Sequence, residues 1–159
     1  MKICVAFYKG DGNVLNKIVR KWTKSVYSHA ELILNDEKTW ISITPFLKSK
    51  IYSKENPEYN KNEWDFLDIS VTPEQHRIIE EFYELTEGCS YDWVGMLFSQ
   101  FLPFRIKQES KWYCSEWIAY ALRISGVIDW KTIQIYDKSD LSPAVLYRMV
   151  EKLQNAQNS

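Results

Sequence analysis

The sequence lacks several features that mark common classes of protein. Its 159 residues include only three cysteines and two histidines, with no Cys-x-x-Cys or His-Glu-x-x-His spacing. A disulfide framework and a zinc site are therefore not expected. There is no glycine-rich phosphate loop, and a net charge of −1 leaves no basic excess for nucleic acid. We expect no metal, no other cofactor and no nucleic-acid partner.

Long apolar runs are missing as well. No stretch approaches the ~18 apolar residues that mark a membrane-spanning helix. The N-terminal segment MKICVAFYKGDG also lacks the apolar core of a signal peptide. We therefore expect a cytoplasmic protein without stable membrane insertion. Nothing in the sequence indicates an oligomeric state.

What the chain does contain is enough apolar material for one packed domain. Hydrophobic residues make up 45% of the sequence and aromatic residues 15%, and the length favours a single domain over 1–159. The patterns predict strands at 2–8, 28–34, 39–44 and 63–70, with a short strand inside the polar segment 46–62. They predict helices at 13–22, 73–87, 91–102, 113–126 and from 142 onward. This order predicts an α+β fold with a small antiparallel sheet packed by helices.

Two of these helices begin with clear capping signals. Asn13 is a plausible N-cap for the first, whose apolar residues fall on one face. Thr72, Pro73 and Gln75 form the capping-box pattern of the second, and Gly88 ends it.

Cys114 stands in the stretch KWYCSEWIAYAL, at the first turn of a predicted helix. The positive end of the helix dipole favours the reactive thiolate, and the free backbone N–H groups there can bind an oxyanion. The alternative is a packing residue, because free cysteines are among the most buried residue types. Cys4 lies in the apolar first strand and is expected in the core. Cys89 follows Gly88 and is the control, a thiol that is free to be exposed.

A cysteine nucleophile needs a base, which is normally histidine. His29 opens the strand 28–34 and shares one face with Glu31, whereas the opposite face is wholly apolar and belongs to the core. His29 then lies on the more polar face or at its edge, where a pocket can form; the alternative is an ordinary surface histidine. His76 lies among charged residues in the first turn of its helix, and we expect it to be solvated.

The imidazole of such a pair is usually oriented by a third polar group. The predicted hairpin places the strand 39–44 beside His29, with Ser42 and Thr44 on one face of that strand. Ser42 is our first choice for this role, Thr44 the second and Glu31 the third. A serine orients the ring without the charge that a carboxylate supplies, and Ser42, Thr44 and Glu31 are also ordinary strand residues.

Two stretches together resemble a known family. TKSVYSHAELIL, followed later by KWYCSEWIAYAL, is similar to the circularly permuted papain-like cysteine hydrolases, the permuted NlpC-like group with its YiiX-type proteins and lecithin–retinol acyltransferase relatives. In that group a histidine that opens a strand precedes a cysteine that opens a helix, as His29 and Cys114 do here. KIVRKWTKSVYSH and SYDWVGML also resemble the phage-encoded and bacterial members. Many relatives carry His, Glu or Asn where this chain offers Ser42.

The resemblance implies a permuted papain-like fold and a cysteine peptidase or amidase that cleaves a peptide or other amide through a thioacyl intermediate. Cys114 would be the nucleophile and His29 its base, with the Cys114 backbone N–H as part of the oxyanion hole. Apart from the resemblance, the Tyr8 hydroxyl at the end of the first strand is a candidate for a second oxyanion donor. The location would be the host cytoplasm or the virion if the protein is phage-encoded. Two alternatives remain open: an acyltransferase or thioesterase for a lipid-like substrate, and a non-catalytic binding protein. Five aromatic residues line an apolar cleft or pack in the core: Tyr27, Trp93, Trp112, Tyr113 and Trp117.

Overall fold

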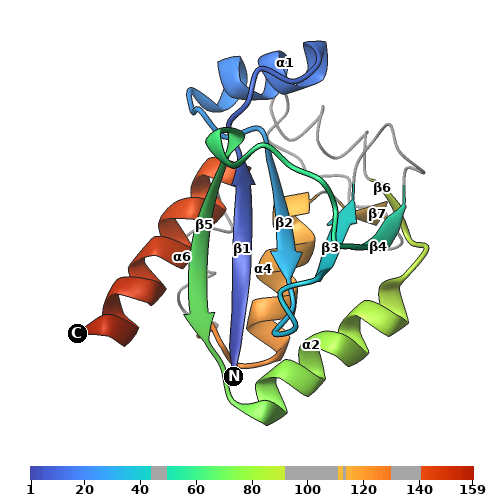
Figure 1. Ribbon diagram of the computed structural model, residues 1–159, viewed down its shortest axis with the longest axis vertical. Helices are drawn as coiled ribbons and strands as arrows, with labels where there is room; N and C mark the ends of the chain where they lie inside the picture. Colours follow the sequence, from blue (N-terminus) through green and yellow to red (C-terminus); the bar gives the residue numbers. More distant parts are fainter. Residues whose placement is uncertain (44–49, 92–110, 113, 130–140) are drawn as a thin grey trace, which may run out of the picture.

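The fold is built around a five-stranded sheet. The computed structural model describes residues 1–43, 50–91, 111–112, 114–129 and 141–159, with backbone alone at 22, 91 and 111–112. Its antiparallel sheet has the strand order β4-β3-β2-β1-β5 (Figure 1). The strands are β1 (Lys2–Tyr8), β2 (His29–Ile33), β3 (Thr39–Ile43), β4 (Ile51–Glu55) and β5 (Trp64–Ser70). A second, parallel pair joins β6 (Ser90–Tyr91) to β7 (Lys111–Trp112).

The predicted α+β class is confirmed. Beside the five-stranded sheet, the described residues form four α-helices and one short 3-10 helix. These are α1 (Val14–Thr23), α2 (Pro73–Thr86), α4 (Cys114–Ile124), α6 (Pro143–Asn158) and η1 (Lys61–Glu63). The short strand expected within 46–62 is β4, whereas the helix expected at 91–102 lies outside the described residues. None of the described helices is long and apolar enough to cross a membrane.

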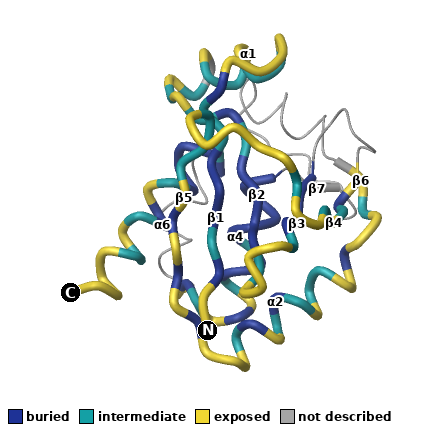
Figure 2. Tube along the Cα trace, viewed as in Figure 1, coloured by how far each residue is buried: buried dark blue, intermediate teal, exposed yellow. Residues whose placement is uncertain are grey.

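One face of the sheet carries the main hydrophobic core. α4 packs against β2, α6 against β5 and β1, and α2 against α4. Ala30 and Leu32 point into this core, as the apolar face of their strand predicted, and both are fully buried. Figure 2 shows β1 and β2 as mostly buried, whereas one side of α2 and of α6 remains exposed.

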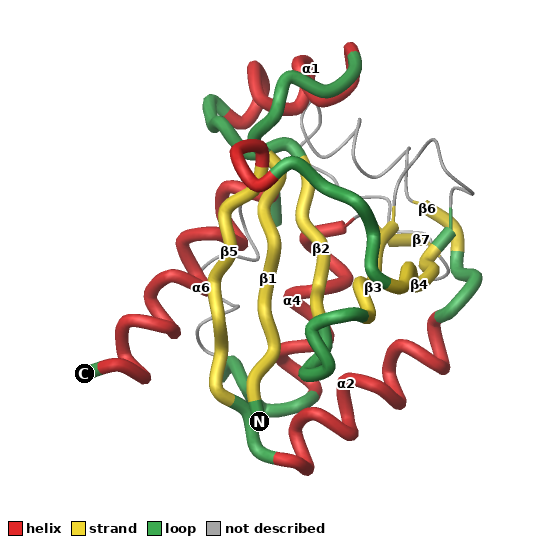
Figure 3. The backbone as a smooth tube through the Cα atoms, viewed as in Figure 1, coloured by secondary structure: helices red, strands yellow, loops and turns green. Residues whose placement is uncertain are grey.

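The opposite face of the sheet is covered in part, which the sequence did not predict. Ala6, Ile33 and Trp40 form a second buried cluster there, and Cys4 and Trp64 pack against it. The connection from β4 to η1 passes over this face (Figure 3), and the Tyr59 ring lies 4.9 Å from that of Trp40. The face expected to be the more polar one is therefore partly closed to solvent. Cys4 is half-buried in this smaller cluster instead of lying in the main core.

α1 lies beyond the end of the sheet where β1 finishes and β2 begins (Figure 1). Asn13 caps it as predicted and forms a capping box with Asn16. The apolar face of this helix is not buried, because Val14 is 73% and Ile18 39% exposed. The Asn16 side-chain amide donates a 2.9 Å hydrogen bond to the Ser28 hydroxyl, which ties α1 to the residue preceding β2.

α2 begins at the predicted capping box of Thr72 and Gln75 and ends before Gly88, whose φ of +82° suits glycine. The prediction that His76 is solvated is wrong, because His76 is only 7% exposed. Its Nε2 accepts a 3.3 Å hydrogen bond from the Asn35 backbone N–H, and its Nδ1 lies 3.2 Å from Glu80. The turn between β2 and β3 therefore covers His76, a tertiary contact that the local charge pattern does not reveal.

Candidate active site

His29 is held at the first position of β2. The Ser28 N–H donates a 3.0 Å hydrogen bond to the Tyr8 carbonyl, and His29 pairs with Tyr8 across the two strands. Among the described residues, β3 pairs with β2 only at Leu32 and Ile33. The beginning of β2 thus pairs with β1 on one side, and α4 packs against the same strand.

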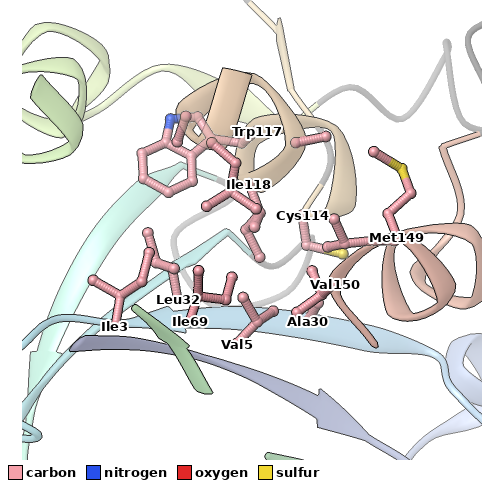
Figure 4. Packing of buried hydrophobic residues seen from close by; sticks show 14 of the residues in the cluster. Ile3, Val5, Ala30, Leu32, Ile69, Cys114, Trp117, Ile118, Met149 and Val150 are labelled. Carbon is pink, nitrogen blue, oxygen red and sulfur yellow. The ribbon is translucent and has the colours of Figure 1, made fainter. Parts of the chain in front are cut away.

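Cys114 is the first residue of α4, as the sequence predicted. The Ser115 hydroxyl donates to the Leu141 carbonyl, which fixes the start of α4 against the segment that leads into α6. Cys114 is 5% exposed and belongs to the same buried cluster as Ala30 of β2 and Val150 of α6 (Figure 4). Cys114 is therefore a member of the main core and, at the same time, lies at the core's boundary with the first residues of β2.

The Cys114 thiol and the His29 imidazole lie close enough for each to shift the pKa of the other. Burial favours the neutral thiol, but the charge of His29 and a hydrogen bond to its ring outweigh burial and lower the pKa of Cys114. Hydrogen bonds to the backbone of Ala30 and Ser115 lower it further. For His29, burial alone would lower the pKa, yet the interactions with Cys114 and then with Glu31 raise it to about 10. The arrangement therefore favours a thiolate–imidazolium pair at neutral pH.

Glu31 is the nearest described acid to the His29 ring. Its Oε1 lies 3.1 Å from His29 Nε2, and its side chain is only 3% exposed. Ser42 Oγ lies 3.4 Å from the same nitrogen and donates a 2.8 Å hydrogen bond to Glu31 Oε1. The structure thus brings both sequence candidates to His29, with the carboxylate as the closer partner. The third candidate, Thr44, lies outside the described residues.

Lys54 is a member of this cluster that sequence reasoning missed. Its Nζ lies 2.8 Å from Glu31 Oε1 and 2.7 Å from Oε2. Burial would raise the pKa of Glu31, but the contacts with His29 and then Lys54 lower it. No local sequence signal pointed to Lys54, since it lies on β4 in a segment interpreted mostly as a polar loop.

Tyr8 lies on the same sheet face as His29, but its hydroxyl is already engaged. It hydrogen-bonds to the Glu63 side chain and to the Gly12 backbone, and burial followed by the Glu63 charge raises its pKa. Its role as an oxyanion donor stays a prediction, and it requires the hydroxyl to leave Glu63.

Two of the five aromatic residues expected at a cleft or in the core have described side chains: Tyr27 is half-buried and packs against the main core, and Trp117 lies inside it. Tyr27 stacks on Tyr147 with 4.5 Å between ring centroids. Trp117 is buried, and its Nε1 donates to Thr86 Oγ1 at 2.8 Å. Trp93 and Tyr113, and the side chain of Trp112, lie outside the described part of the chain.

The other two thiols have different surroundings. Burial, and then the negative charge of Asp68, raise the pKa of Cys4 to about 12, so Cys4 stays protonated at neutral pH. Cys89 is half-buried against the main core, and its backbone carbonyl accepts a 2.9 Å hydrogen bond from the Ile51 N–H. Of the two, Cys89 is the better control for a reactive thiol.

The comparisons with known proteins do not identify a family for this chain. No protein-family model matches the chain, and no curated protein is similar enough to count as a relative. Among the described residues, no group of three or more His, Cys, Asp and Glu side chains is arranged to hold a metal ion.

Proposed function

We propose that the protein is a cysteine hydrolase in which Cys114 is the nucleophile and His29 its acid–base partner. The observation that carries the proposal is the half-buried imidazole of His29, which lies 3.1 Å from the Glu31 carboxylate and interacts with the Cys114 thiol. A cysteine used only for packing has no need of a charged, oriented imidazole beside it. The combination of nucleophile, base and orienting acid is the constellation that covalent catalysis requires.

The reaction follows from these groups. The Cys114 thiolate attacks the carbonyl carbon, and the π electrons move to the oxygen, where the free N–H groups at the start of α4 stabilise the negative charge. The tetrahedral intermediate collapses, the C–N bond breaks and the leaving amine takes the proton from His29. His29 then removes a proton from water, which attacks the thioacyl carbon. The C–S bond breaks, and the carboxylic acid and the thiolate are released.

We further propose Glu31, with Ser42 supporting it, as the group that orients His29. A carboxylate on Nε2 fixes the ring and leaves Nδ1 for the thiol, and it stabilises the imidazolium that the pair requires. Ser42 donates to Glu31 Oε1 and so holds the carboxylate in place. This order reverses the preference for Ser42 from the sequence, because a negative charge 3.1 Å from Nε2 stabilises the imidazolium more than a hydroxyl at 3.4 Å.

A circularly permuted papain-like arrangement is part of the same proposal. It is supported by the chain order, with His29 opening a strand and Cys114 opening a helix that packs on this strand. The choice of an amide as substrate, in a peptide or a related compound, follows from the resemblance described above.

The experiment is a labelling comparison with electrophilic probes. One probe carries a peptide backbone, a second carries a long acyl chain, and each is offered to the wild type and to Cys114→Ala. Peptide-probe labelling that disappears in Cys114→Ala is the expected result. Preferential labelling by the acyl-chain probe would support acyl transfer or thioester hydrolysis instead, whereas a biological effect that survives in Cys114→Ala would indicate a binding protein.

A further inference from the structure

The Lys54–Glu31 ion pair is the feature that the proposed reaction does not yet explain. Glu31 is 3% exposed and Lys54 29%, so this is one of the least exposed ion pairs among the described residues. An isolated buried carboxylate is costly and tends to take up a proton. Glu31 therefore needs a neighbouring positive charge to stay ionised. Its two cationic partners are His29 and Lys54.

These two cations differ in what happens to them during the proposed reaction. His29 gives up its proton to the leaving group, so its positive charge vanishes at the step where the intermediate collapses. Lys54 takes no part in that transfer and keeps its charge, and in the structure its Nζ lies 2.7 Å from Glu31 Oε2. Lys54 is thus suited to hold Glu31 ionised while His29 is neutral, so that the same carboxylate can stabilise the imidazolium again when water is deprotonated.

The sheet builds this contact across three strands. Lys54 pairs with Trp40, and Trp40 pairs with Ile33, so Lys54 comes level with a residue two positions beyond Glu31. Its side chain crosses β3 diagonally, and Nζ lies 5.7 Å from the centroid of the Trp40 ring. The Lys54 ammonium group is therefore held between the face of the Trp40 ring and the Glu31 carboxylate.

We propose that Lys54 is a positioning residue of the active site, which acts through Glu31 to keep the carboxylate charged and His29 oriented. This inference rests on the proposed function. The polar groups that face Glu31 are His29 on its own strand, Ser42 on β3 and Lys54 on β4; its partner on β1 is Ala6, which carries no charge. The Cys114 thiol on α4 faces His29.

The test is the pH profile of Cys114 alkylation by iodoacetamide in Lys54→Met, which keeps the stem and removes the charge. Without Lys54, Glu31 takes up a proton at higher pH, and the imidazolium–thiolate pair is lost with it. We expect the acidic limb of the profile to move up by about one pH unit, the lower end of the range for a neighbouring charge. Lys54→Arg should keep the wild-type profile.

Two further variants separate a role through Glu31 from a general effect. In a Glu31→Gln background, Lys54→Met should produce no additional shift, because the charge on which Lys54 acts has gone. Lys2→Met removes a lysine from the exposed pair with Asp68 and should leave the profile unchanged. If Lys54→Met does not fold, Lys54→Gln replaces it, since the amide donates to the carboxylate without carrying a charge.

The outcomes distinguish this inference from the proposed function. If wild-type Cys114 reacts no faster than Cys89, the proposed function fails. If Cys114 is selectively alkylated but Lys54→Met and Lys54→Gln lower only the melting temperature, with the pH profile unmoved, Lys54 is purely structural and the inference alone is overturned. A full shift that persists in the Glu31→Gln background would also overturn it.

Discussion

Glu31 Oε1 lies 3.1 Å from His29 Nε2, and the same imidazole ring interacts with the Cys114 thiol. The carboxylate, the imidazole and the thiol therefore form a continuous path from β2 to the first turn of α4. The Cys114 and His29 pKa values move in opposite directions because each group stabilises the charge of the other.

The selectivity of thiol alkylation is the first prediction. Iodoacetamide should modify Cys114 faster than Cys89, and Cys4 should be the slowest because its pKa is raised to about 12. In His29→Ala, the rate at Cys114 should fall by about tenfold or more, since the buried thiol loses its cation. Peptide mapping by mass spectrometry measures all three sites in one sample. Equal rates at the three thiols would indicate that Cys114 is a packing residue.

Substitution of Glu31 should slow the alkylation of Cys114 more than substitution of Ser42. Glu31→Gln removes the charge that supports the imidazolium and should lower the alkylation rate of Cys114 at neutral pH by about tenfold. Ser42→Ala removes one hydrogen bond to the carboxylate and should have an effect of less than about tenfold. The two rates are compared in variants whose circular dichroism matches the wild type. A larger loss in Ser42→Ala would make Ser42 the principal orienting residue, as the sequence first suggested.

The main core supports the site and can be tested separately. Leu32 lies one residue beyond Glu31, is completely buried and packs in the core shared with α4. Leu32→Ala should lower the free energy of unfolding by roughly 2–5 kcal/mol. Leu85→Ala is the control, because Leu85 is 83% exposed, and its effect should stay within about 0.5 kcal/mol. Urea denaturation measures both; a similar loss in the two variants would contradict the assigned core.

Local patterns were sufficient to find the residues that open elements. His29 and Cys114 each stand at the start of a strand or helix whose periodicity is clear, and the apolar face containing Ala30 and Leu32 was predicted for the same reason. Capping at Asn13 and Thr72 also depends on neighbouring residues alone and was confirmed.

Contacts between distant segments could not be predicted in this way. The burial of Glu31 depends on the second cluster around Trp40, and its partner Lys54 comes from an edge strand 23 residues further along the chain. His76 was expected to be solvated because its neighbours are charged, yet the turn after β2 covers it. In each case the contact that buries the residue depends on the order of the strands in the sheet or on where a loop runs. The periodicity of the sequence contains neither piece of information.

The most direct test of the central claim is the ionisation of Cys114, followed as ultraviolet thiolate absorbance in the wild type minus that of Cys114→Ser across a pH range. The account predicts that the thiolate is present below pH 9.0, the ordinary pKa of cysteine, and is lost only as the pH falls through a lowered value. In His29→Ala the same titration should move to higher pH, because burial is then opposed only by the hydrogen bonds to the backbone of Ala30 and Ser115. A wild-type midpoint at or above 9.0, unchanged in His29→Ala, would contradict the thiolate–imidazolium pair and the hydrolase built on it.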